Sequence, residues 1–122
     1  MKKFLIISAV LAWLFGVFLL FFPDKFYAPT GIAMTSLVST IAQAHAATLI
    51  GLGFVNWFSR NLKGENVQGI LLGNLVVQIL SLIVVVRTML LGPGLALLPG
   101  VVIHVVLGSC FGYFAVKNSK AK

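Results

Sequence analysis

Two histidines are the residues of this chain best suited to chemistry, and they occupy matching places in two apolar runs. His45 lies about nine residues into a run that begins near Ser36, and His104 lies about nine residues into a run that begins near Leu95. If both runs cross a bilayer in the same direction, each imidazole lies roughly 12 to 15 Å below the same boundary. Because imidazole is a common axial ligand, the pair is a candidate bis-histidine site for a tetrapyrrole.

Neighbouring residues fit such a cofactor but also leave a structural role open. Gly108, one helical turn after His104, would leave room for a flat ring, and Arg87 would pair with a propionate. In the competing interpretation both histidines are structural and hydrogen-bond to backbone carbonyls, Gln43 or Ser109. Without a surrounding motif the two histidines do not decide between haem, a chlorophyll-type tetrapyrrole and no cofactor.

Other reactive residues are few. The only acids, Asp24 and Glu65, are expected in loops, so the sequence places no carboxylate pair or proton-relay acid inside a membrane. The single cysteine, Cys110, excludes an internal disulfide and a cysteine-based metal cage. No phosphate-binding loop, zinc motif or nucleophile triad is present. The sequence therefore predicts no enzymatic activity and no metal site.

The composition predicts a membrane protein. The chain has 122 residues, of which 60% are hydrophobic and 9% charged, whereas soluble domains carry about 25% charged residues. A hydrocarbon core about 30 Å thick requires roughly 20 apolar residues per helix. Four such runs cover approximately residues 4–22, 36–58, 67–91 and 95–116. We predict a single integral-membrane domain over residues 1–122, folded as an all-α antiparallel bundle of four transmembrane helices.

The first run is expected to remain as a span. A secretory signal peptide has an apolar region of about 7 to 15 residues that ends in small residues. The run here extends from Phe4 to Phe22 and ends in Leu-Leu-Phe-Phe-Pro. Its length and its bulky end favour a transmembrane helix.

The basic residues predict the orientation of the spans. One side receives Lys2, Lys3, Arg60, Lys63, Lys117, Lys120 and Lys122, whereas the other receives Lys25 and Arg87. By the positive-inside rule both termini are cytoplasmic, and the loop of residues 23–35 and the Gly92-Pro93-Gly94 connection face outward. The net charge of +7 thus sits at span ends, which does not fit a nucleic-acid surface.

Small and polar residues inside the runs predict how the helices associate. Small residues four apart allow close helix packing, and each run has such a pair. These pairs are Ala12 and Gly16, Ala47 and Gly51, Gly69 and Gly73, and Gly108 and Gly112.

A stripe of polar residues follows the third run at helical spacing, and Arg87 points away from it. Its members are Asn74, Gln78, Ser81 and Thr88. In the second run His45, Leu52 and Asn56 share a stripe. Such residues either hydrogen-bond between helices or line a water path.

The polar turn between the second and third runs carries a resemblance to other proteins. The segment GLGFVNWFSRN, the later GILLGN and the Phe22-Pro23 pair resemble a loose group of small, uncharacterised bacterial four-span membrane proteins. The resemblance rests on Asn56, Trp57, Arg60, Asn61 and Asn74. It implies a four-helix bundle in the bacterial inner membrane and carries over no catalytic residue. Without the resemblance, the residues have a simpler interpretation: Trp57 and Arg60 anchor the helix at the membrane–water interface, and Asn61 helps to end the helix.

These observations favour a non-enzymatic accessory or assembly subunit. Its expected partners are the lipid bilayer and either another membrane protein or further copies of this chain, with no nucleic acid. A tetrapyrrole-binding subunit that uses His45 and His104 is one alternative. A small transporter or channel that uses the polar stripe is another.

Overall fold

The computed structural model describes residues 1–92 and 94–120, and the secondary structure of these residues is helical. Among them, four helices are long and apolar enough to cross a membrane, as predicted. They are α1 (Lys2–Phe21), α3 (Ser36–Ser59), α4 (Glu65–Leu91) and a fourth, Gly94–Ser119, made of the 3₁₀ turn η2 (Gly94–Leu97) and α5 (Leu98–Ser119). Pro93 of the predicted outer connection and Lys122 of the basic end lie outside the described residues.

The loop after α1 contains two short helices that the sequence did not predict. Pro23 has no N–H to donate, so it ends α1 and begins α2 (Pro23–Tyr27), which η1 (Ala28–Thr30) follows. The Thr35 hydroxyl then caps α3 by accepting the N–H of Val38 at 3.2 Å. Tyr27 packs against the core between α1 and α3. Burial raises the pKa of its phenol above the ordinary value.

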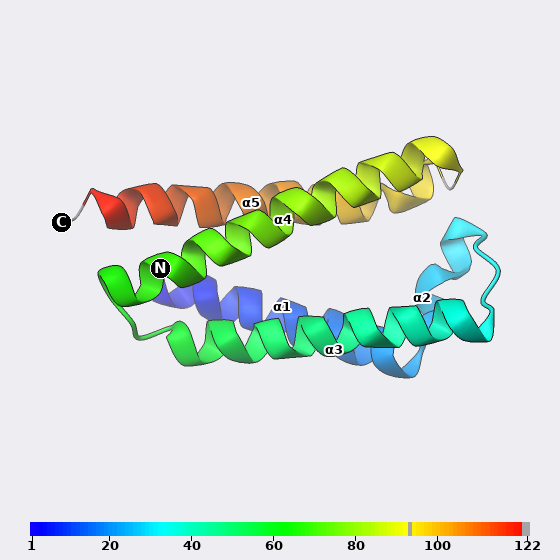
Figure 1. The fold of residues 1–122 in the computed structure, drawn as a ribbon, viewed down its shortest axis with the longest axis horizontal. Coiled ribbons are helices and arrows are strands. Elements are labelled where there is room, and N and C mark those ends of the chain that lie inside the picture. The colour runs from blue at the N-terminus through cyan, green and yellow to red at the C-terminus, as the bar shows by residue number, and fades with distance from the viewer. Residues whose placement is uncertain (93, 121–122) are drawn as a thin grey trace. The chain divides into compact units, whose positions relative to one another are not determined.

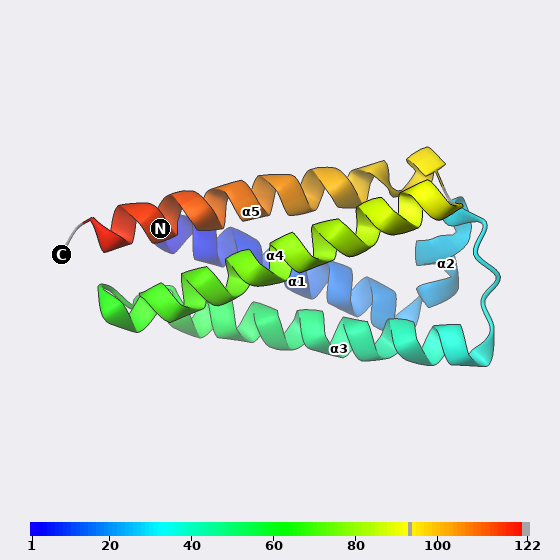
Figure 2. The same cartoon turned by 45° about the horizontal axis from the view of Figure 1, so that its top comes forward.

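The chain divides into two compact units, Met1–Arg60 and Asn61–Lys122. Each is a pair of antiparallel helices: α1 lies beside α3, and α4 lies beside α5 (Figures 1 and 2). Gly64, at the start of the second unit, has a φ of 59°, a left-handed conformation that favours glycine. The prediction of long antiparallel apolar helices is confirmed, whereas their assembly into a single four-helix domain stays a prediction.

The contact between α1 and α3 is lined mainly by small residues. Its positions alternate in steps of four and three, the repeat of helices that wind around each other. On α1 they are Leu5, Ala9, Ala12, Gly16 and Leu19, and on α3 they are Ala42, Ala46, Leu49, Gly53 and Asn56. A Cβ atom added to Gly16 would lie 3.1 Å from the Ala46 carbonyl oxygen. The first hairpin is therefore packed closely enough for the two backbones to approach each other.

The contact between α4 and α5 is more polar. The buried residues on α4 are Val67, Leu71, Asn74 and Gln78, again in steps of four and three, and those on α5 are Phe111 and Ala115. At the open end of this hairpin, where α4 begins and α5 ends, the Asn118 side-chain amide donates to the Gly64 carbonyl at 2.8 Å and to Gln68 Oε1 at 2.7 Å. Hydrogen bonds thus join α4 to α5 at this end. We call the buried line of contact between the two helices of a hairpin its seam.

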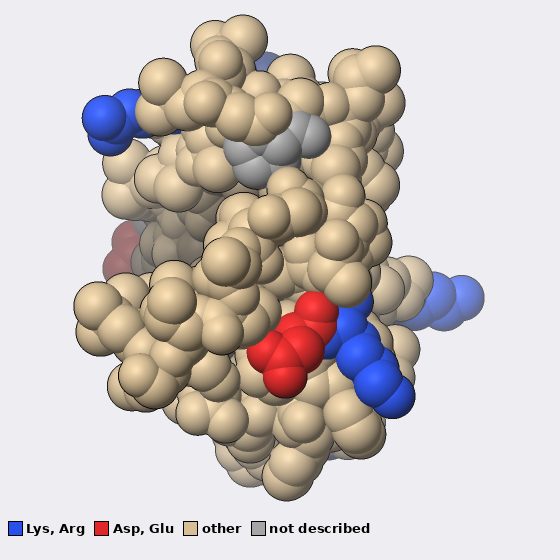
Figure 3. Space-filling model, turned by 90° about the vertical axis from the view of Figure 1, so that its right-hand side faces the viewer, with Lys and Arg blue, Asp and Glu red and all other residues tan. Residues whose placement is uncertain are grey.

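The outward faces of the helices carry large apolar side chains. Leu90 is 78% exposed, Leu95 is 77% exposed and Phe58 is 71% exposed. In the space-filling view, residues without a charge cover most of the face drawn, and the few charged side chains include an acidic and a basic one side by side near its centre (Figure 3). Exposed apolar side chains along helices of this length fit contact with lipid, so the structure describes a multi-pass membrane protein.

Candidate functional site

A hydrogen bond between Gln78 and His104 joins the middle of α4 to α5. His104 Nδ1 lies 2.8 Å from Gln78 Oε1. Because an amide oxygen can only accept, Nδ1 must carry the proton and donate it. In the neutral ring this makes Nε2 the basic nitrogen, and it holds the imidazole in one orientation. Metal-ligating histidines typically donate their second nitrogen to an acceptor in the same way.

A small cavity of about 200 Å³ lies beside this pair. Gln78, His104 and Ser109 form its polar lining, and apolar residues such as Leu75 and Val105 form the rest. Gly108 also lines it, where a Cβ atom would come within 3.4 Å of Gln78 Cβ. We call this cavity the Gln78 notch. Several polar side chains of the second hairpin border this one cavity.

The two predicted axial ligands lie on different hairpins, and the stripe expected on α3 is divided. Asn56 is fully buried against α1, whereas His45 is exposed on the flank of α3. The expectation of a shared stripe was wrong because it assumed 3.6 residues per turn. The contact follows a 3.5-residue repeat, on which positions eleven apart diverge by about 50°. The bis-histidine site stays a prediction, and His104 borders the Gln78 notch.

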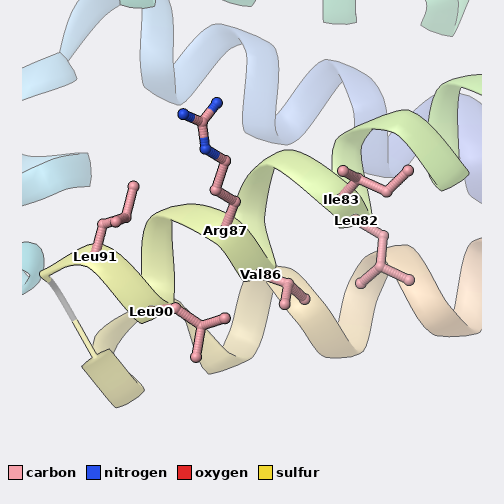
Figure 4. Close-up of a pocket in the computed structure, with 6 residues that line it drawn as sticks. All are labelled: Leu82, Ile83, Val86, Arg87, Leu90 and Leu91. Atoms are coloured by element: carbon pink, nitrogen blue, oxygen red, sulfur yellow. The ribbon is translucent and has the colours of Figure 1, made fainter.

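Arg87 lies on the exposed side of α4, near its C-terminal end. Its side chain points away from α5 and rises from a hollow lined by apolar residues of α4, among them Ile83 and Leu90 (Figure 4). It therefore does not reach the Gln78 notch within the second hairpin. The proposed pairing of Arg87 with a propionate stays a prediction.

The predicted polar residues lie at the helix contacts. Asn56 Nδ2 donates to the Ser8 hydroxyl at 3.0 Å, which joins α3 to α1. Asn74 Nδ2 donates to the Ile70 carbonyl at 2.9 Å, and Ser81 is half-buried on the same side of α4. Because these side chains bond to protein or lie in the seam, their placement favours helix pairing over a continuous water path.

The segment that carries the resemblance forms an aromatic cluster with α1. Trp13 packs against Phe54 and Trp57, with ring centroids 5.1 and 5.5 Å apart. The Arg60 guanidinium lies over the Trp57 ring at 4.1 Å, which is a cation–π contact. Gly53 makes room for the cluster, because a Cβ atom there would lie 2.5 Å from the Trp13 ring.

Sequence reasoning missed Trp13 and Gly53, and it misplaced some of the small pairs. A Cβ atom added to Gly51, Gly69 or Gly73 would meet nothing within 4 Å. Ala47 is exposed, Ala12 is half-buried, and Gly112 makes ordinary contact with Leu75. Spacing by four identifies two residues on one face but not the face that meets a partner. The alternating steps of four and three, read along both helices together, would have selected Gly53.

No protein-family model, curated protein or solved structure matches the chain.

Proposed function

We propose that this protein is a non-enzymatic accessory or assembly subunit of a complex in the bacterial cytoplasmic membrane. The supporting observation is that polar side chains inside the spans are used to join neighbouring helices. Asn56 bonds to Ser8 in the first hairpin, and Gln78 bonds to His104 in the second. The outward faces are left apolar, which suits contact with lipid and with the apolar faces of another membrane protein.

We test the partner with photoreactive phenylalanine at exposed and buried aromatic positions. Phe58 and Tyr113 are 71% and 59% exposed, whereas Phe111 is fully buried and serves as the control. Illumination of whole cells is expected to link one defined polypeptide, another membrane protein or a second copy, to an exposed position but not to position 111. The proposal fails if exposed positions give only lipid adducts and gentle detergent extraction yields a single isolated chain.

We also propose that both termini face the cytoplasm, because seven of the nine basic residues lie on one expected side. The test uses a Cys110→Ser background with a new cysteine at Lys25 or Lys63, labelled in intact cells with a membrane-impermeant maleimide. The cysteine at position 25 is expected to react and the one at 63 to stay unlabelled until the membrane is broken. The reverse pattern would invert the topology.

A tetrapyrrole-binding subunit is the second candidate, favoured by the hydrogen bond that orients His104. The absorption spectrum of the protein obtained by gentle detergent extraction, recorded before and after reduction, tests this candidate. A Soret band that shifts on dithionite reduction and disappears in His104→Ala would establish haem ligation. A spectrum empty above 300 nm would remove this candidate.

A further inference from the structure

We infer that the Gln78 notch binds the head group of a lipid-soluble quinone. The inference concerns a small-molecule site in the second hairpin and does not depend on whether the protein is an accessory subunit. It rests on three properties of the notch: its unused hydrogen-bond donors, its depth in the helix pair and its size.

Two donors border the notch without a hydrogen-bond partner among residues 1–92 and 94–120. Gln78 is only 6% exposed, and its Oε1 accepts the proton of His104, which leaves the amide nitrogen with two N–H groups. The Ser109 hydroxyl has no partner either, unlike the Thr88 hydroxyl, which donates to the carbonyl four residues earlier. Unsatisfied donors in an apolar setting cost free energy, so an acceptor that enters the notch is favoured.

The depth of the notch within the membrane limits which molecules can supply that hydrogen-bond acceptor. Gln78 lies thirteen residues after Glu65 and thirteen before Leu91, so it is central in α4 and about 20 Å from either end. Ser109 is likewise near the middle of α5. Phospholipid ester carbonyls lie at the edges of a hydrocarbon core about 30 Å thick, so they do not reach this depth. A quinone is apolar enough to enter the core and still presents two carbonyl acceptors.

The size and opening of the notch fit a single ring. Its volume of about 200 Å³ lies below the roughly 300 to 1,000 Å³ of drug-sized pockets. The lining residues Ile79, Val105 and Ser109 are exposed, so the notch opens on the outer surface of the hairpin. A quinone ring would enter laterally, accept from Gln78 and Ser109, and leave its alkyl tail among the lipids.

The test measures binding of decylubiquinone to the full chain in phospholipid nanodiscs free of quinone, with protein-free nanodiscs subtracted. We expect saturable binding of one molecule per chain. Ser109→Ala should weaken it about three- to tenfold, as expected for one neutral hydrogen bond. Ser109→Phe fills the notch from its exposed side and should abolish binding. Thr48→Val, a matched loss of a hydroxyl that bonds its own helix in the first hairpin, should leave binding unchanged.

Circular dichroism checks that each variant keeps its helices before binding is compared. Decylbenzene, which has the tail and a ring but no carbonyl, should not compete. The inference is overturned by any of three results: no saturable binding, as for a notch that holds water alone; unchanged binding in folded Ser109→Phe; or equal competition by decylbenzene.

Discussion

Replacing Gly53 with alanine is expected to destabilise the first hairpin by about 1 to 3 kcal/mol, the usual cost of overpacking. The added methyl group would lie 2.5 Å from the Trp13 ring and 3.1 Å from the Ala9 carbonyl oxygen. The second contact is with backbone, so a change of rotamer cannot relieve it. The helices must separate instead, which also weakens the Asn56–Ser8 hydrogen bond.

Gly51→Ala is the matched control, because a Cβ atom there meets nothing within 4 Å. Its free energy of unfolding should change by less than about 1 kcal/mol, the difference in helix propensity between glycine and alanine. Both values come from titration with sodium dodecyl sulfate in mixed micelles, followed by far-ultraviolet circular dichroism. Equal changes in the free energy of unfolding for the two substitutions would contradict the placement of Gly53, and not Gly51, in the contact between α1 and α3.

Replacing Gln78 with leucine is expected to cost about 1 to 3 kcal/mol, because it leaves the Nδ1–H of His104 without the acceptor that the structure gives it. Hydrogen bonds between membrane helices contribute about 0.6 kcal/mol on average. Most of the expected loss therefore comes from removing the acceptor of the half-buried Nδ1–H and not from the bond itself.

The double variant Gln78→Leu, His104→Leu distinguishes these two contributions. Removal of both partners leaves an apolar contact, so part of the lost stability should return. Thr88→Val, which loses only a bond to the carbonyl of Val84, should change stability by less than about 0.5 kcal/mol. If the double variant is as unstable as the sum of Gln78→Leu and His104→Leu measured separately, the pairing is not the cause.

The spans could be predicted from sequence because length and composition alone determine them. The runs predicted at residues 36–58 and 67–91 became α3 and α4 with nearly the same bounds, since a helix that satisfies its own backbone is favoured in lipid. The short helix α2 was missed because Pro23 both ends one helix and starts the next. Its dual role is not visible without the geometry of the turn.

The face that each helix presents to its partner could not be predicted from one helix at a time. Gly51 and Gly53 are separated by one residue, yet only Gly53 lies against α1, because Trp13 projects from the other helix at that level. The partner of His104 was sought nearby in the sequence, at Ser109, or at Gln43. It is Gln78, 26 residues earlier, which the pairing of α4 with α5 brings into reach.

The position of the two tryptophans gives the molecule an intrinsic optical reporter. Trp13 and Trp57 are the only indoles of the chain, and both belong to the unit Met1–Arg60. Their rings lie 5.5 Å apart, and the Arg60 guanidinium covers one of them. Emission therefore reports on the opening of α1 from α3, and neither α4 nor α5 contributes an indole of its own. Compared with the ellipticity of the whole chain, it would reveal which hairpin unfolds first, without an added label.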